Sequence, residues 1–302
     1  MTDEINSSAR LDSFPLRLTA RSSVDCSRTL RRLTVNQRTT YRWSLVQEVV
    51  ACEQASLGGL GLWRPKLAEF GEKRAVELIR DSGLAVSSLS WAGAFTGVNG
   101  YSFADAIDDA SDALALAAEL GAASLIVVSG PRGNHTRRHA RRLVVEGLKH
   151  LADGAAEAGV TLVLEPMRWP RFADWTFLSA VDDTIELLDA CGHDAVKLAF
   201  DTYHLGREPD LIGRLNEIAP WVGLVQWSDP RSLLAGWDES RPSEAAAPLE
   251  EITAGLLAGG YDGFFEIESW SEAVWSSDYD ELLARSAARF EALCGVSRPA
   301  HA

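Results

Sequence analysis

Short apolar runs alternate with longer amphipathic stretches along almost the whole chain, and this alternation restricts the possible folds more than any other feature. A short apolar run flanked by turn residues is typical of a strand that is buried on both faces. Eight such runs are present, at residues 33–36, 59–63, 86–91, 124–129, 161–167, 196–204, 221–229 and 263–268. We therefore expect eight strands that are shielded from solvent.

The stretches between these runs have the spacing of amphipathic helices. They cover residues 44–55, 66–82, 102–120, 136–158, 178–190, 209–218, 248–258 and 279–293. Gly83, Gly121 and Gly159 directly follow three of them, which is where a helix commonly ends on a glycine. Eight expected helices thus alternate with the eight expected strands.

Strands that alternate with helices pair in parallel, because each helix crosses over the sheet to the start of the next strand. Eight units predict an α/β fold with a single closed (β/α)₈ barrel, the TIM barrel, over residues 33–302. At 302 residues the length also allows two domains, but such barrels commonly need about 250 residues as one domain. A doubly wound open sheet is the alternative, and no GxGxxG follows the first strand to favour it.

The first residues differ in composition from the expected barrel. Residues 1–42 hold eight arginines and four acids, a net charge of +4. Since the whole chain carries −14, the remaining residues carry −18. Many serines and threonines with few apolar residues predict a flexible basic tail over residues 1–32. The acidic barrel lacks the basic surface that nucleic acids and anionic membranes require, so we expect neither as a partner.

Cysteine usage and hydropathy bear on where the protein acts. The four cysteines lie far apart without a CxxC pair, as is usual in a reducing compartment. No apolar run approaches the roughly 18 residues of a membrane-spanning helix, and the N-terminus has no apolar signal region. We expect a cytoplasmic location.

Polar side chains end the last four expected strands, and in a (β/α)₈ barrel the active site lies at the carboxyl ends of the strands. Glu165, Asp201, Gln226 and Glu268 each end a mostly apolar run. Four neighbouring strands would bring these side chains to one point. Glu266 precedes Glu268 by two positions, so it shares its face and is expected deeper in the barrel.

Clustered carboxylates repel one another unless a cation neutralises them, so this set predicts one bound divalent metal ion. Carboxylate and amide oxygens favour Mn²⁺ or Mg²⁺, with Co²⁺ or Zn²⁺ tolerated. Any one of these residues alone could equally be a helix cap or part of a surface ion pair. Four on consecutive strands favour the metal site.

The last four strands resemble those of the xylose-isomerase-like TIM-barrel superfamily of sugar phosphate isomerases and epimerases. The matching segments are LEPM with Glu165, FDTYH with Asp201 and His204, and YDGFFEIE with Glu268. The resemblance implies that Glu165, Asp201 and Glu268 bind the metal and that Glu165 and Glu268 also act as acid and base. It further implies that His204 and Arg241 contact the substrate.

Strand seven departs from the commonest pattern of this superfamily, in which a histidine is the third metal ligand. Gln226 stands in its place, which resembles the hydroxypyruvate isomerase branch. The resemblance to endonuclease IV fails, because that enzyme needs many histidine ligands and this chain has six histidines in all.

A metal held by these residues would polarise an α-hydroxycarbonyl compound and stabilise the enediolate formed when a proton is lost. The resulting expectation is a divalent-metal-dependent isomerase or epimerase of a sugar-like compound. A lyase or specialised-metabolite tailoring enzyme, acting by elimination or cyclisation on the same barrel, is the alternative. A non-catalytic ligand-binding barrel is a third possibility, against which the intact acids argue.

Tryptophan placement bears on the substrate. Eight of the ten tryptophans follow or end a strand, and Trp63, Trp91, Trp169 and Trp227 are expected to bind substrate. The simpler interpretation is that these rings pack loops over the barrel mouth. Several arginines, Arg168 and Arg207 among them, also follow strands and could hold a carboxylate or a phosphate. We expect a small-molecule substrate and, from the resemblance, a homodimer or homotetramer.

Overall fold

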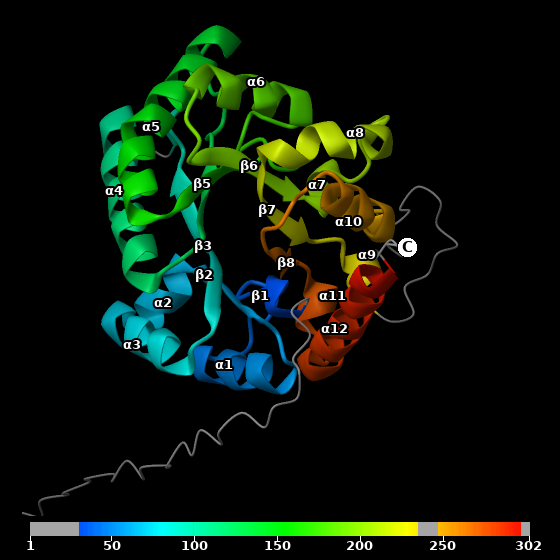
Figure 1. The fold of residues 1–302 in the computed structure, drawn as a ribbon. Coiled ribbons are helices and arrows are strands. Elements are labelled where there is room, and N and C mark those ends of the chain that lie inside the picture. Colours follow the sequence, from blue (N-terminus) through cyan, green and yellow to red (C-terminus); the bar gives the residue numbers. More distant parts are fainter. Residues whose placement is uncertain (1–29, 99, 235–246, 297–302) are drawn as a thin grey trace, which may run out of the picture.

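The computed structural model describes residues 30–98, 100–234 and 247–296, which form one closed parallel barrel (Figure 1). Its eight strands pair in chain order, and the last pairs with the first. They are β1 (Leu33–Asn36), β2 (Gly59–Trp63), β3 (Ala85–Gly93), β4 (Ser124–Val128), β5 (Thr161–Leu164), β6 (Val196–Asp201), β7 (Val222–Trp227) and β8 (Phe265–Ile267). The predicted (β/α)₈ barrel is confirmed.

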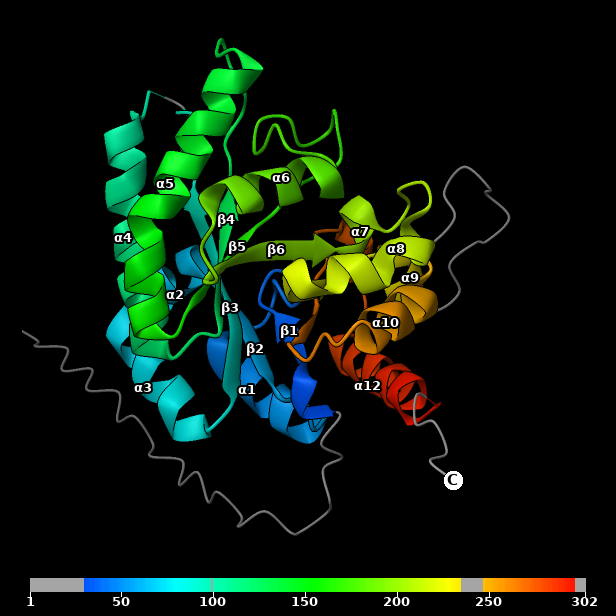
Figure 2. The same cartoon turned by 45° about the horizontal axis from the view of Figure 1, so that its top comes forward.

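Helices form a ring outside the strands, as two views of the ribbon show (Figures 1 and 2). The large ones are α1 (Leu45–Gln54), α2 (Arg64–Phe70), α3 (Glu72–Ser82), α4 (Phe103–Leu120), α5 (Arg137–Ala158), α6 (Val181–Cys191), α8 (Leu211–Ile218), α10 (Leu249–Ala258) and α12 (Tyr279–Val296). Shorter helical turns are η1 (Leu30–Arg32), α7 (Thr202–Leu205), η2 (Ala219–Trp221), α9 (Pro230–Leu233) and α11 (Glu272–Trp275). No described helix is both long and apolar enough to cross a membrane.

Most expected boundaries shift by a few residues, and three of the differences change the structural interpretation. The expected helix over residues 66–82 is two helices, because Gly71 at φ 95° interrupts it. The expected strand 196–204 ends at Asp201, whose side chain accepts the backbone N–H groups of Tyr203 and His204 and so caps the short helix α7. His204 therefore lies on a helical turn just above the strand.

The expected tail boundary at residue 33 also shifts. Leu30 is buried, and the Arg32 side chain donates hydrogen bonds to the carbonyl oxygens of Gly263 at 2.9 Å and Tyr261 at 3.0 Å. Residues 30–32 are therefore part of the barrel. The rest of the expected tail lies outside the described residues.

The barrel interior has an apolar half and a polar half. Ile126, Val163, Ala199 and Leu224, from β4 to β7, form an apolar cluster inside the barrel. On the other side the Glu266 carboxylate accepts hydrogen bonds from Asn36, Ser87 and Ser88, at 2.6–2.7 Å. This polar half lies under the part of the mouth where β8 ends.

Glu48 on α1 fixes the loop that follows β1. Its buried carboxylate accepts hydrogen bonds from Gln37 Nε2 at 2.7 Å, Thr40 Oγ1 at 2.6 Å and Lys66 Nζ at 2.5 Å. Thr39 in the same loop donates to the carbonyl oxygen of Ile267 at 3.1 Å. Residues 37–40 are thereby held against the end of β8.

Replacement of Glu48 by alanine should lower the free energy of unfolding by about 3–5 kcal/mol, because Lys66 loses the partner of a largely buried charge. Urea denaturation of the two proteins measures this change. Glu53→Ala, on the exposed face of the same helix, is the matched control and should change the value by less than about 0.5 kcal/mol. Equal effects of the two substitutions would contradict the role assigned to Glu48.

Candidate active site

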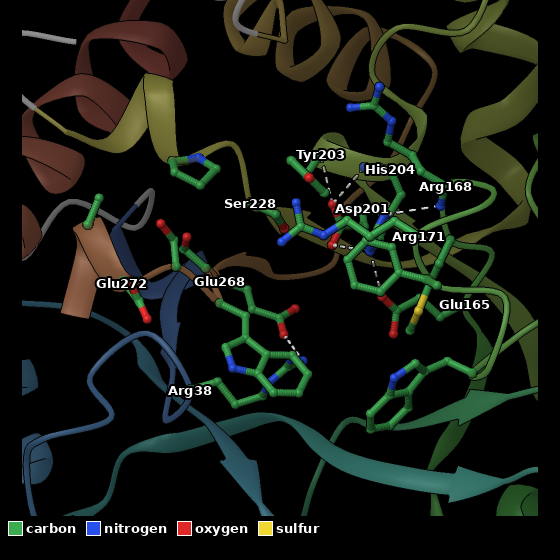
Figure 3. A pocket seen from close by; sticks show the side chains of 18 of the residues that line it. Arg38, Glu165, Arg168, Arg171, Asp201, Tyr203, His204, Ser228, Glu268 and Glu272 are labelled. Atoms are coloured by element: carbon green, nitrogen blue, oxygen red, sulfur yellow. Dashed lines mark hydrogen bonds and ion pairs between the residues drawn. The ribbon is translucent and has the colours of Figure 1, made fainter. Parts of the chain in front are cut away.

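A cavity of about 860 Å³ opens at the carboxyl ends of the strands (Figure 3). This volume lies within the range of about 300–1,000 Å³ that is common for small-molecule sites. Its charged lining consists of acids and arginines: Glu165, Asp201, Glu268, Glu272, Arg38, Arg168, Arg171 and Arg207. The rest of the lining is largely aromatic, with Trp91, Trp175, Trp270 and Trp275 among its members.

Glu165 and Asp201 meet next to His204. One carboxylate oxygen of each acid and one ring nitrogen of His204 lie within 4.8 Å of one another. Asp201 Oδ1 accepts the N–H groups of Tyr203 at 2.7 Å and His204 at 3.2 Å, so the cap of α7 also fixes this carboxylate. The barrel thus brings the ends of β5 and β6 together as the sequence predicts.

Glu268, just beyond β8, is held by two neighbours. One of its oxygens forms an ion pair with Arg38, and the other accepts a hydrogen bond from Gln226 Nε2. The backbone N–H of Glu268 donates to the carbonyl oxygen of Trp227 at 3.0 Å. Gln226 therefore contacts Glu268 from beneath the cavity lining, to which Glu268 belongs and Gln226 does not.

Arg38 is a member of the site that the sequence reasoning missed. Its guanidinium carbon lies 4.2 Å from the ring centre of Trp91 and 4.3 Å from that of Trp270, between the two indoles. It follows the end of β1 by two residues. A search for polar residues after the first strand, made as for the last four strands, would have found it.

Burial raises the pKa values of the three central carboxylic acids. It raises the pKa of Asp201 to about 7 and that of Glu268 to about 7. The pKa of Glu165 is raised well above its ordinary value, first by burial and then by the charges of Glu268 and Asp201. The positive charge of Arg38 lowers all three pKa values but does not cancel the effect of burial.

His204 is a neutral hydrogen-bond donor in this arrangement. Burial, followed by the charges of Arg168 and Arg38, lowers its pKa to about 3. Its Nδ1 accepts the backbone N–H of Arg168 at 3.2 Å, so the single ring proton resides on Nε2. Nε2 lies 3.9 Å from both Glu165 Oε1 and Asp201 Oδ2. A protonated Nε2 suits contact with a substrate oxygen rather than metal ligation.

The remaining donor set fits a divalent cation. Glu165 Oε2 and Gln226 Oε1 are buried and have no hydrogen-bond partner. Such orphaned oxygens are costly unless a cation or water satisfies them. Glu165, Asp201, Gln226 and Glu268 together offer three carboxylates and one amide oxygen, a set of hard ligands.

The predicted substrate-binding tryptophans do not all reach the cavity. Trp91 lines it, whereas Trp63 lies beside Tyr41, with ring centres 6.3 Å apart, and Trp169 is 68% exposed outside the lining. Trp227 is fully buried behind the barrel wall, where its Nε1 donates to Thr253 Oγ1 at 3.1 Å. Trp227 therefore does not line this cavity, because Gln226 points inward and adjacent side chains on a strand point to opposite faces.

Of the other two predicted substrate contacts, His204 lines the cavity. Arg241 lies outside the described residues. Trp175 and Trp270 also line the cavity and pack near Trp91, with ring centres 4.7 Å and 6.2 Å from that of Trp91. The observed aromatic wall is therefore built by Trp91, Trp175 and Trp270.

Comparison with known proteins agrees with this architecture. The family model described as xylose isomerase-like TIM barrel matches residues 50–293, most of the chain. The chain belongs to this family. A related protein of Streptomyces coelicolor, named putative hydroxypyruvate isomerase, is 26% identical over 247 residues, which are 74% of this chain and 85% of the relative.

Solved structures show the same barrel in other members. A Sinorhizobium meliloti protein superposes with a TM-score of 0.75 at 26% identity, covering 88% of this chain and 99% of the other. L-ribulose 3-epimerase matches with a TM-score of 0.72 at 19% identity, over 90% of this chain and 99% of its own. The IolI protein, solved with a bound zinc atom, matches with a TM-score of 0.72 at 17% identity, over 88% of this chain and 99% of its own. The last two likenesses concern the fold alone.

The raised carboxyl pKa values predict how stability depends on pH without metal. Between about pH 4 and pH 7 the folded protein keeps protons on Asp201 and Glu268 that the unfolded chain has lost. The free energy of unfolding therefore falls as pH rises through this range. Asp201→Asn should reduce this fall by on the order of 3 kcal/mol. Denaturation in chelator at pH 5 and pH 8 measures the difference.

The matched control for this experiment is Asp189→Asn on the exposed face of α6. It should leave the pH dependence of the wild-type protein unchanged. If Asp201→Asn behaves in the same way as this control, Asp201 is not held protonated near neutral pH.

Proposed function

We propose that the protein is a divalent-metal-dependent isomerase or epimerase of a sugar-like α-hydroxycarbonyl compound. The observation that carries the proposal is that Glu165, Asp201 and Glu268 line one cavity. Gln226 contacts Glu268 from beneath that lining, and within this set Glu165 Oε2 and Gln226 Oε1 are buried without a hydrogen-bond partner. Family membership and the hydroxypyruvate isomerase relative support the same class of reaction. A small-molecule substrate, a cytoplasmic location and a homodimer or homotetramer belong to the proposal as well.

Glu165, Asp201, Gln226 and Glu268 would hold the metal. When bound, a divalent ion supplies Lewis-acid polarisation of the substrate carbonyl and hydroxyl oxygens. Mn²⁺ or Mg²⁺ suits these oxygen ligands best, and the zinc bound to IolI keeps Zn²⁺ among the candidates, together with Co²⁺.

The protein's own groups supply the proton transfers. Glu165 and Glu268 lie at the ends of different strands, so they can reach opposite sides of a substrate in the cavity. One carboxylate takes the proton next to the carbonyl, giving an enediolate. Return of a proton to the neighbouring carbon, with transfer of the hydroxyl proton to the former carbonyl oxygen, completes isomerisation. Return of the proton to the opposite face of the same carbon completes epimerisation. His204 Nε2–H donates to a substrate oxygen, and the tryptophan wall excludes water.

The size and aromatic wall of the cavity favour one second candidate, a lyase or specialised-metabolite tailoring enzyme acting on a bulkier compound. A volume of about 860 Å³ lined by Trp91, Trp175 and Trp270 exceeds what a three-carbon substrate fills. Loss of a leaving group adjacent to the same enediolate would give elimination. Product analysis by NMR distinguishes the two, because elimination releases a second molecule and isomerisation does not.

Removal of the proposed bases tests the reaction. Glu165→Gln and Glu268→Gln should each slow solvent-deuterium incorporation next to the substrate carbonyl by at least about a hundredfold, because a positioned base contributes about 10²–10⁴. NMR in D₂O at saturating Mn²⁺ measures the exchange. Glu157→Gln, exposed on α5, is the control and should exchange at the wild-type rate. Undiminished exchange in both glutamate variants would refute the assignment.

Metal removal provides an independent prediction. Chelator should abolish exchange and lower the melting temperature, and Mn²⁺ should restore both, since a ligand at 100 times its Kd stabilises the folded state by about 2.7 kcal/mol. Metal analysis of the purified protein and thermal unfolding with and without chelator check this. A protein that is fully active and equally stable in chelator would argue against a metal-dependent reaction.

A further inference from the structure

The four arginines of the cavity lining fall into two pairs with different partners. Arg38 forms an ion pair with Glu268, and Arg207 Nη2 lies 2.9 Å from Asp229 Oδ2. Neither Arg168 nor Arg171 has a carboxylate oxygen within 4 Å among the residues that the structure describes. Within the described part of the chain, these two exposed arginines thus have no acidic group within ion-pair distance.

These two arginines rest on aromatic rings next to His204. The guanidinium carbon of Arg168 lies 5.5 Å from the ring centre of Tyr203, and that of Arg171 lies 5.7 Å from the ring centre of Phe172. Phe172 and Tyr203 in turn pack edge-on against His204, with ring centres 4.7 Å and 5.1 Å apart. The rings therefore hold both arginines beside a residue of the proposed reaction centre.

Figure 3 shows Arg168 and Arg171 on the side of the cavity that carries His204 and Asp201, with Glu268 and Arg38 on the other side. The charges of both arginines also contribute to lowering the pKa of His204, as expected for cations within its surroundings. The Phe172 ring belongs to the β5–α6 loop, and the Tyr203 ring belongs to α7.

Among the described lining residues, two arginines are left over when the other charges are paired. Arg38 together with one divalent ion would neutralise the carboxylates of Glu165, Asp201 and Glu268, and Asp229 forms an ion pair with Arg207. Arg168 and Arg171 then leave two positive charges, faced by the single exposed acid Glu272 among the described lining residues. In a chain of net charge −14, such a local excess of positive charge marks a place built to attract an anion.

We propose that Arg168 and Arg171 form an anion-binding subsite that holds a carboxylate or phosphate group of the substrate away from its reacting carbons. The substrate is then a sugar acid or a sugar phosphate. That the substrate also carries a hydroxycarbonyl group rests on the proposed function, whereas the anion subsite is inferred from the two arginines alone. A guanidinium group binds either kind of anion through paired N–H donors, so the probes decide between them.

Binding measurements on the intact protein test the subsite. Isothermal titration with Mn²⁺ present compares D-ribulose 5-phosphate with D-ribulose, D-fructuronate with D-fructose, and inorganic phosphate as a probe without a sugar. We expect an anionic probe to bind at least tenfold more tightly than its neutral counterpart. The double variant Arg168→Gln/Arg171→Gln should weaken anionic binding about tenfold to hundredfold, because hydrogen bonds to a charged group are lost.

The matched control is Arg74→Gln/Arg138→Gln, which removes the same charge outside the cavity. Arg74 stands on an aromatic ring in the same way as the subsite arginines, with its guanidinium carbon 5.0 Å from the Phe70 ring centre. This control should bind every probe as the wild type does. Preference for D-ribulose 5-phosphate identifies a phosphate subsite, and preference for D-fructuronate identifies a carboxylate subsite.

Equal binding of charged and neutral probes, no binding of any anionic probe, or equal losses in both double variants would overturn the subsite. Deuterium exchange with the same sugars separates this result from the proposed function. If the exchange rate is the same for charged and neutral sugars, the isomerase proposal is supported and the anion subsite is refuted. If phosphate binding depends on Arg168 and Arg171 but the protein exchanges no sugar proton, the anion subsite is supported and the isomerase proposal is refuted.

Discussion

Three carboxylic acids are buried together at one end of the barrel, and the surrounding structure compensates for that arrangement. An isolated buried carboxylate is strongly disfavoured, and three neighbours add repulsion. Arg38 supplies one compensating charge to Glu268, and the backbone N–H groups at the start of α7 stabilise Asp201. Glu165 Oε2 and Gln226 Oε1 still have no hydrogen-bond partner, which is why the site fits a divalent ion.

The position of Arg38 depends on contacts far from the reacting groups. Glu48 on α1 binds the side chains of Gln37 and Thr40, on either side of Arg38 in the sequence, and Thr39 is tied to the end of β8. Two indoles then enclose the guanidinium. Helix α1 on the outside of the barrel thus fixes the Arg38 guanidinium at the barrel mouth, through the loop that follows β1.

The same barrel separates chemistry from recognition. The proposed metal-binding set comes from the ends of β5 to β8, whereas the aromatic wall, Arg168 and Arg171 come mainly from the loops that follow strands. Strand ends are fixed by pairing on both sides, so they suit groups whose geometry must be constant. Loops can change in length and composition without disturbing the barrel, so they suit the groups that select a substrate.

The sequence by itself determined the eightfold alternation, the closed parallel barrel, and the acids and amide that end its last four strands, because hydrophobic periodicity and strand-end position are local properties. Only the tertiary structure decided which side chains share the cavity. In the sequence Trp227 and Trp91 both lie at the end of a strand. Because the preceding Gln226 points into the barrel, the Trp227 side chain points outward to the helices, where it donates to Thr253. Arg38 joins Glu268 across 230 positions of sequence, through the β1–β8 pairing that closes the barrel, and no local pattern carries that information.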